Sequence, residues 1–355
     1  MTKNEEFLYR YLNNASPTGF EASGQQIWLD YVKPLVDDYF TDAYGTAVGV
    51  INPQADYKVV IEAHADEISW FVNYITPEGY IYVVRNGGSD HMIAPSMRVN
   101  IHTDERVIQG VFGWPAIHVR DKAKEEAPKT ENIFIDVGAR SKEEVLEMGV
   151  YVGCVVTFKD ELTDLNGKFY TGRALDNRIG GYMIAEVARY LKEQKRKLPF
   201  GVYVVNAVQE EIGLRGAEMI AASIKPNAAL ITDVCHDTTA PMYNKVVSGD
   251  YTAGKGPVLT VGPAVHRKLL DLVLAAAHKR EIPYQRSASS RSTGTDTDAF
   301  AYSNGGVPSA LISLPLKYMH TTVETASKSD INDVIRLMAG FLEDFDPSFD
   351  FRYVK

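Results

Sequence analysis

Seven side chains of the types that bind metal ions fall at points where strands or helices of an α/β chain are expected to end or begin. Two are histidines and five are carboxylates: His64, Asp66, Asp176, Glu210, Glu211, Asp233 and His320. Considered alone, each has a simpler explanation; Asp176, for example, suits the N-cap of the helix that follows it. Gathered at one edge of a sheet, however, the carboxylates would repel one another unless cations lay between them. The set therefore points to a metal centre.

Imidazole nitrogen and carboxylate oxygen are donors that zinc and similar divalent ions accept, and catalytic sites keep one coordination position open. Five ligands can hold two ions if one carboxylate bridges them. Two ions about 3.5–4 Å apart lower the pKa of a shared water and polarise a carbonyl group. A further carboxylate must take the proton from that water and pass it to the leaving amine, and one of two adjacent glutamates can do so while the other binds metal.

The elements that would position these residues alternate between helices and strands after Thr171. Continuous apolar runs at Phe200–Asn206, Ala228–Val234 and Ser309–Leu314 predict buried strands, and the apolar spacing of Arg178–Gln194 predicts a helix. Such alternation is typical of a three-layer fold, a largely parallel sheet with helices on both faces. Ligands of these sheets bind beyond the carboxyl ends of the strands, which is where the candidate residues fall.

The N-terminal part adds two helices and two strands, expected at Glu5–Asn13, Gln25–Val36, Ala47–Ile51 and Val59–Ala63. From 69 to 164 the sequence changes to short, β-rich runs with one clear helix, at Ser141–Met148. We therefore expect a catalytic α/β domain formed by residues 1–68 and 165–355, interrupted by a smaller inserted β-rich domain formed by residues 69–164.

Composition narrows the class of protein. The 355 residues include 46 acidic and 37 basic side chains, a net charge of −9, which argues against a surface that binds nucleic acid or anionic lipid. The two cysteines, Cys154 and Cys235, belong to no paired metal or redox motif. The N-terminal residues do not resemble a signal peptide, and no stretch approaches the roughly 18 apolar residues of a membrane span. We expect a cytoplasmic protein that binds neither nucleic acid nor membranes.

The motifs around the candidate residues resemble those of the tetrahedral, or glutamyl-type, aminopeptidases of metallopeptidase family 42, in the same order along nearly the whole chain. The matching segments are His64-Ala65-Asp66-Glu67, Gly172–Arg178, Val208–Gly213, Ile231–Val234 and Tyr318–His320, together with Ser16–Glu21 and Gly294–Asp296. The chain departs from the family at Ser69-Trp70, where Gly-Phe is frequent, and we expect the bulky Trp70 to narrow or reshape the pocket at the metal rim.

The resemblance implies a role for each candidate residue. It assigns one ion to His64, Asp176 and Asp233, and the other to Asp176, Glu211 and His320. It also implies that Glu210 is the general base that activates a metal-bridging water, and that Asp66 orients the metal-binding histidine. The cofactors would be two divalent ions per subunit, zinc above all, with cobalt or manganese as alternatives.

The resemblance further implies an aminopeptidase that removes N-terminal residues from short peptides, with dimers built through the inserted domain and often assembled into dodecamers. A related dimetal deacylase or carboxypeptidase is the alternative enzyme, and a catalytically silent oligomeric scaffold is the alternative of another class. A requirement for a free amine separates them, because an N-acetylated peptide should resist the aminopeptidase. The loops Gly254–Pro257 and Arg291–Asp296 are expected to form walls of the substrate pocket.

Overall fold

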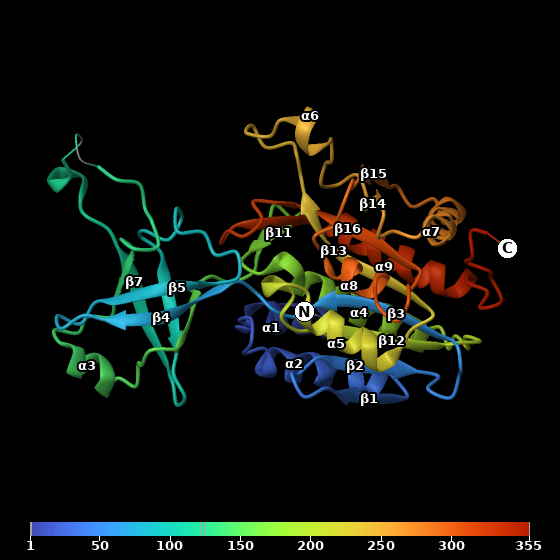
Figure 1. Cartoon of the computed structure of the whole chain (residues 1–355), viewed down its shortest axis with the longest axis horizontal. Coiled ribbons are helices and arrows are strands. Elements are labelled where there is room, and N and C mark those ends of the chain that lie inside the picture. The colour runs from blue at the N-terminus through green and yellow to red at the C-terminus, as the bar shows by residue number, and fades with distance from the viewer. Residues whose placement is uncertain (1, 122, 124, 355) are drawn as a thin grey trace.

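The computed structural model describes residues 2–121, 123 and 125–354. The chain forms a large α/β part and a smaller β-barrel, which lie side by side along the long axis of the molecule (Figure 1). Helices α1 (Lys3–Asn13) and α9 (Lys328–Asp344), near the two ends of the chain, both belong to the large part. The barrel is inserted in the sequence between β3 (Lys58–His64) and β10 (Thr163–Leu165).

Among the described residues, the large part is built on one eleven-stranded sheet. Its other strands are β1 Asp38–Thr41, β2 Ala47–Ile51, β11 Phe169–Gly172, β12 Gly201–Ala207, β13 Ala228–His236, β14 Val258–Val261, β15 Gln285–Ala288, β16 Ser309–Lys317 and β17 Glu324–Ser327. Nine strands follow one path, in the order β1-β2-β12-β3-β13-β16-β17-β11-β10. The remaining two extend from β16, which pairs with β14, which in turn pairs with β15.

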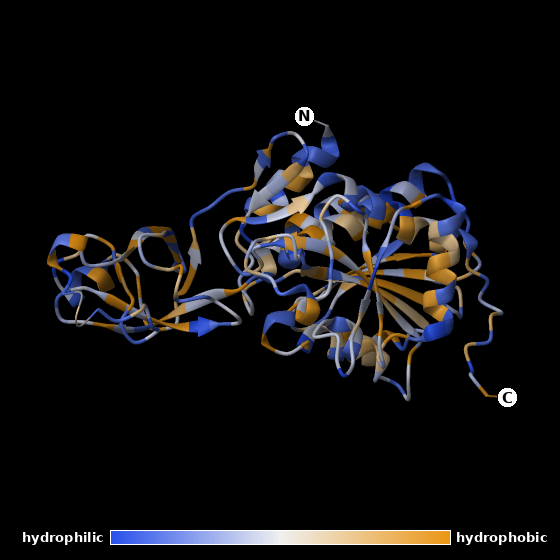
Figure 2. Cartoon of the chain, turned by 90° about the horizontal axis from the view of Figure 1, so that it is seen from above, coloured by the Kyte–Doolittle hydropathy of each residue, from blue (hydrophilic) through white to orange (hydrophobic). Residues whose placement is uncertain are grey.

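The four central strands, β12, β3, β13 and β16, run parallel. They are apolar runs buried on both faces, as central parallel strands require (Figure 2). Ala207 at the end of β12 lies opposite His64 at the end of β3, so these two carboxyl ends meet at one edge. The flanking pairs β1–β2, β10–β11 and β16–β17 are antiparallel, because short connections join their strands. The sheet is therefore mixed, and the expected parallel arrangement holds for its four central strands and for the pair β14–β15.

The other helices of the large part are α2 Ala22–Val32, α4 Leu175–Glu193, α5 Arg215–Ile224, α6 Lys245–Ser248, α7 Arg267–Lys279 and α8 Asp296–Ala301. Helix α4 packs on α1, α2, α9 and β3, whereas α5 and α8 pack on each other and on central strands. Gly180 allows the close approach of α4 to β3, since a Cβ atom there would lie 2.8 Å from that of Ala63. In the described part of the chain, no helix has both the length and the apolar character needed to cross a membrane.

The inserted part is a closed β-barrel with the strand order β4-β5-β8-β7-β6-β9. Its elements are β4 Ser69–Ile75, β5 Ile81–Asn86, β6 Arg98–His102, β7 Val107–Gly113, β8 Phe134–Asp136, α3 Lys142–Glu147 and β9 Val155–Phe158. Trp70 is buried in the core of the barrel, against Phe112, so the expectation that it reshapes the metal rim is wrong. Strand β10 pairs with β11 in the large sheet, so the domain limit expected at residue 164 lies inside β10.

Candidate metal centre

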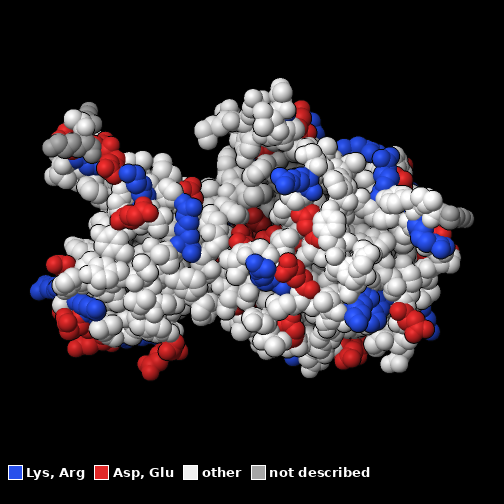
Figure 3. Space-filling view, in the orientation of Figure 1, with Lys and Arg blue, Asp and Glu red and all other residues white. Residues whose placement is uncertain are grey.

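Six of the seven candidate residues line one cavity of about 830 Å³. They come from separate elements: His64 from the end of β3, Asp176 from the start of α4, Glu210 and Glu211 from the 3-10 turn Glu210–Ile212 after β12, Asp233 from β13, and His320 from the loop after β16. Figure 3 shows acidic side chains in a hollow of the large part, on the side near the barrel. The parallel strands thus bring together residues that are far apart in the sequence.

Asp176 lies between the two histidines. Its Oδ1 atom is 3.3 Å from Nε2 of His64, and its Oδ2 atom is 3.3 Å from Nε2 of His320. Oε1 of Glu211 is 3.4 Å from the same His320 nitrogen. Each oxygen of Asp176 therefore faces a different imidazole.

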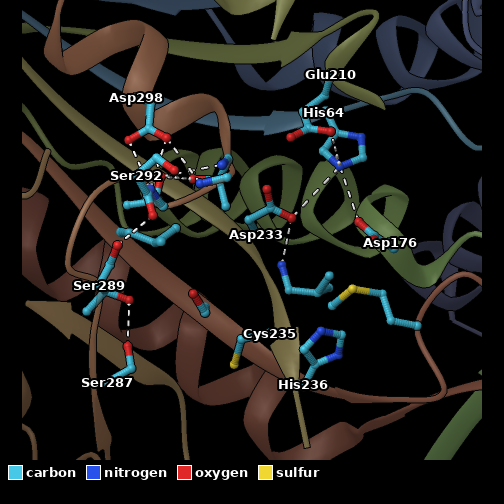
Figure 4. A pocket seen from close by; sticks show the side chains of 18 of the residues that line it. His64, Asp176, Glu210, Asp233, Cys235, His236, Ser287, Ser289, Ser292 and Asp298 are labelled. Carbon is cyan, nitrogen blue, oxygen red and sulfur yellow. Dashed lines mark hydrogen bonds and ion pairs between the residues drawn. The ribbon is translucent and has the colours of Figure 1, made fainter. Parts of the chain in front are cut away.

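Two further carboxylates approach His64. Oδ1 of Asp233 lies 3.8 Å and Oε2 of Glu210 lies 3.9 Å from its Nε2 atom (Figure 4). Two groups have ligand atoms within 4.8 Å of one another, namely His64 with Glu210 and Asp233, and His64 with Asp176 and Glu211. These groups supply only nitrogen and carboxylate oxygen, so their chemistry fits zinc or a similar divalent ion.

The burial of so many ionisable groups changes their proton affinity. Burial raises the pKa of Glu210 to about 10 and that of Asp233 to about 7, and nearby carboxylates add to both shifts. Burial opposes the charged form of His320, but the hydrogen bonds and negative charges of Asp176 and Glu211 together more than offset it and raise the pKa of His320 to about 11. Protons held on these side chains therefore reduce the negative charge of the cluster. Bound divalent ions would supply positive charge in their place.

Asp66, the seventh candidate, lies behind the cluster and is fully buried. Its Oδ1 atom is 3.3 Å from Nδ1 of His64 and accepts a 3.0 Å hydrogen bond from the backbone amide of Glu210. Its Oδ2 atom accepts hydrogen bonds from the backbone amide of Glu211 and the hydroxyl of Thr18. Asp66 therefore contacts one imidazole and holds the backbone amides of both adjacent glutamates, which accords with an orienting role.

The rest of the cavity wall is rich in hydroxyl groups, which include those of Thr260, Ser287, Ser289, Ser292, Thr293 and Ser313 (Figure 4). His236 and Asp298 also line it. The carboxylate of Asp298 accepts hydrogen bonds from the backbone amides of Thr293 and Gly294, which holds this loop in place. Asp298 was not among the predicted site residues, although the run of serines and threonines from 287 to 297 indicates a polar wall.

The two loops expected to line the pocket behave differently. Residues 292–295 of the second loop do line the cavity. The first loop is not among the lining residues; instead, the amides of Gly254 and Gly256 donate hydrogen bonds to the buried carboxylate of Asp330. That loop therefore has a structural contact that its glycine-rich sequence did not indicate.

An α/β sheet whose strand ends carry a buried cluster of histidines and carboxylates defines a class, the metal-dependent hydrolases. The model of the M42 glutamyl aminopeptidase family matches residues 45–337, and the chain belongs to this family.

Relatives agree with this assignment. The lysyl aminopeptidase of Pyrococcus furiosus is 35% identical, over 96% of this chain and 97% of its own. The crystal structure of a TET aminopeptidase from a marine sediment thaumarchaeon superposes with a TM-score of 0.92, at 28% identity, and covers 97% of each chain. The TET1 peptidase of Pyrococcus horikoshii, which can assemble into a tetrahedron or a large octahedral shell, has a TM-score of 0.86 at 27% identity over 97% of this chain and 100% of its own. The chain is a metal-dependent aminopeptidase.

Proposed function

We propose that this aminopeptidase works with two divalent ions per subunit, zinc being the expected metal and cobalt or manganese the alternatives. The ligands are His64, Asp176, Glu211, Asp233 and His320. When bound, such ions lower the pKa of a water molecule and polarise the peptide carbonyl. The observation that carries the proposal is the position of Asp176, whose two oxygens each lie 3.3 Å from a different histidine.

Glu210 is the general base in this proposal. Its carboxylate lines the cavity 3.9 Å from Nε2 of His64, and its backbone amide is fixed by Asp66. From there it takes a proton from the attacking water and delivers it to the leaving amine of the peptide. The neighbouring Glu211 turns its carboxylate toward His320 and is assigned to the metal instead.

The wall of the cavity favours short peptides with a basic or neutral N-terminal residue over those with an acidic one. Asp298 adds a negative charge to a wall that is otherwise rich in hydroxyl groups. Among the described residues that line the cavity, none is lysine or arginine, so apart from the histidines and the proposed ions no positive charge there offsets that of a substrate carboxylate. The name of the lysyl aminopeptidase among the relatives supports a preference for lysine.

The aminopeptidase reaction requires a free α-amine, and this provides the test. A lysyl peptide and its N-acetylated form should be compared with the metal-loaded protein and with protein stripped by a chelator. We expect cleavage of the free peptide only, loss of activity on stripping, and recovery on adding zinc or cobalt. Cleavage of both peptides at similar rates would instead indicate a deacylase or carboxypeptidase, and no cleavage at full metal occupancy would indicate a silent scaffold.

We also propose that the chain self-associates through the barrel, into dimers that can build a dodecamer. The shells formed by the Pyrococcus horikoshii peptidase support this proposal. The barrel carries two apolar side chains in an exposed turn at Ile117–Val119, since Ile117 is 66% and Val119 is 77% exposed. Side chains of this kind are suited to an interface with a second copy.

A further inference from the structure

We propose that Glu324 is a positioning residue for the part of the centre formed by Asp176 and His320. This inference rests on the metal centre proposed above. Glu324 is the first residue of β17, is only 2% exposed, and pairs in the sheet with Gly172 of β11. It therefore sits on the framework of the large sheet, directly beside the start of α4.

The carboxylate of Glu324 joins the backbones of two metal ligands. Its Oε2 atom accepts a 3.0 Å hydrogen bond from the backbone amide of Asp176, and its Oε1 atom accepts a 2.6 Å hydrogen bond from the backbone amide of His320. The side chains of those two residues meet 3.3 Å apart. The buried carboxylate of Glu324 thus sets the separation of the Asp176 and His320 backbones, whose side chains must face the same ion in the proposed centre.

Both backbones adopt conformations that need such support. His320 has φ of +62°, in the left-handed region of backbone conformation that residues other than glycine rarely adopt. Asp176 departs from helical geometry within the first turn of α4, with ψ of 110°. Amides in the first turn of a helix also lack partners within the helix, and a buried amide without an acceptor is costly. Glu324 supplies the acceptor in both places.

Asp66 is a precedent for this arrangement within the same site. It accepts hydrogen bonds from the amides of Glu210 and Glu211, just as Glu324 does from those of Asp176 and His320. Both oxygens of Glu324 contact backbone amides, and Glu324 belongs to neither group of ligand atoms that gather within 4.8 Å, so the residue acts through the ligands and is not itself one. Loss of Glu324 should lower the affinity for the ion between Asp176 and His320 more than the affinity for the ion beside Asp233.

The test is Glu324→Gln, which keeps the size of the side chain but turns one acceptor into a donor that faces a backbone amide. Metal affinity is measured by competition with a chelator, and the visible spectrum of the cobalt-loaded protein reports the geometry of the bound ions. We expect the affinity for one ion to fall about 10–100-fold while the other is retained, with an altered cobalt spectrum. Activity should recover in part at high metal concentration.

Asp330 provides a matched control. It is also fully buried and accepts hydrogen bonds from two backbone amides, those of Gly254 and Gly256, but it contacts no metal ligand. Asp330→Asn should lower thermal stability without changing either metal affinity or the cobalt spectrum. If Glu324→Gln does not fold, Glu324→Asp replaces it, because the shorter side chain keeps the carboxyl group but cannot span both amides, and the same loss of one ion is expected.

Unchanged affinity for both ions in the folded Glu324 variant would overturn the inference, as would an equal loss in the Asp330 control. Failure of the proposed function gives a different result, since the unmodified protein would then bind fewer than two ions or fail to cleave the free peptide.

Discussion

Oδ2 of Asp176 lies 3.3 Å from Nε2 of His320, and the other oxygen of the same carboxylate lies at the same distance from His64. Asp176 is thus the one residue whose two oxygens reach both histidines in the described site. The carboxylate comes from the start of a helix, whereas one histidine ends strand β3 and the other lies in the loop after β16. Packing of α4 on β3 therefore brings Asp176 to the residues that the sheet gathers.

The first prediction concerns this bridge. Asp176→Ala should remove both ions, because each loses a ligand, whereas Asp233→Ala should remove mainly the ion beside His64. Elemental analysis of protein shown to be folded by circular dichroism measures the occupancy, with the exposed Asp271→Ala on α7 as control. Two ions per subunit in Asp176→Ala would show that the carboxylate does not bridge.

The second prediction concerns the substrate side chain. Hydrolysis of lysyl peptides should exceed that of glutamyl peptides in kcat/KM, and Asp298→Asn should reduce the preference roughly five- to tenfold by removing a charge from a partly buried wall. Ser292→Ala, which changes the same wall without changing its charge, should leave the ratio unaltered. Equal rates for lysyl and glutamyl peptides in the unmodified enzyme would disprove this account of the pocket.

The third prediction concerns pH. Burial, followed by repulsion from Asp66, raises the pKa of Glu21 to about 7, although its carboxylate accepts hydrogen bonds from the amides of Gly19 and Gln209. A raised pKa means that the folded protein binds this proton more tightly than the unfolded chain does. The stability contributed by Glu21 is thus present below about pH 4.5 and is lost as the pH rises through about 7.

Glu21→Gln stays neutral, so its free energy of unfolding should fall less between pH 4.5 and 7 than that of the unmodified protein, by up to about 3 kcal/mol. Urea unfolding at several pH values measures the difference. The exposed Glu78→Gln should follow the unmodified protein. Parallel curves for Glu21→Gln and the unmodified protein would contradict the prediction.

The fourth prediction concerns assembly. Replacing both Ile117 and Val119 by Asp should place charges in the proposed interface and lower the mass in solution, as measured by light scattering. Val354→Asp, at an equally exposed apolar position near the end of the chain, is the control and should assemble normally. An unchanged mass for the double variant would show that the turn at Ile117–Val119 is not part of an interface.

Sequence patterns predicted the parts of the fold that have strong periodicity. Strand β2 begins and ends at the predicted residues, and the long helix α4 begins three residues before its predicted start. The missed strands, such as β15 with the sequence Gln-Arg-Ser-Ala and β17 with Glu-Thr-Ala-Ser, are short and largely polar. Their pairing partners, and not their own residues, make them strands.

The site residues that the sequence could not predict likewise depend on contacts that form only in the fold. The candidate ligands could be found because they follow apolar strands at chemically informative positions, and parallel strands end at a common edge. Glu324 could not, because its role depends on contacts with backbone amides, which any sequence supplies, and Asp298 could not, because only the fold brings it to the cavity wall. The sequence also does not distinguish the base from the metal ligand among the two adjacent glutamates, because that depends on the direction of their side chains. Distances to the histidines place both Glu210 and Glu211 close to the proposed ions.

The division of roles between Glu210 and Glu211 is therefore the central claim, and metal content measured together with turnover tests it most directly. Glu210→Gln should keep both ions and bind peptide normally while kcat falls about 10²–10⁴-fold, because glutamine cannot accept the proton. Glu211→Gln should lose occupancy of one ion and regain part of its activity in excess metal. If Glu210→Gln instead loses metal and is rescued by added zinc or cobalt, while Glu211→Gln keeps both ions, the two roles are reversed.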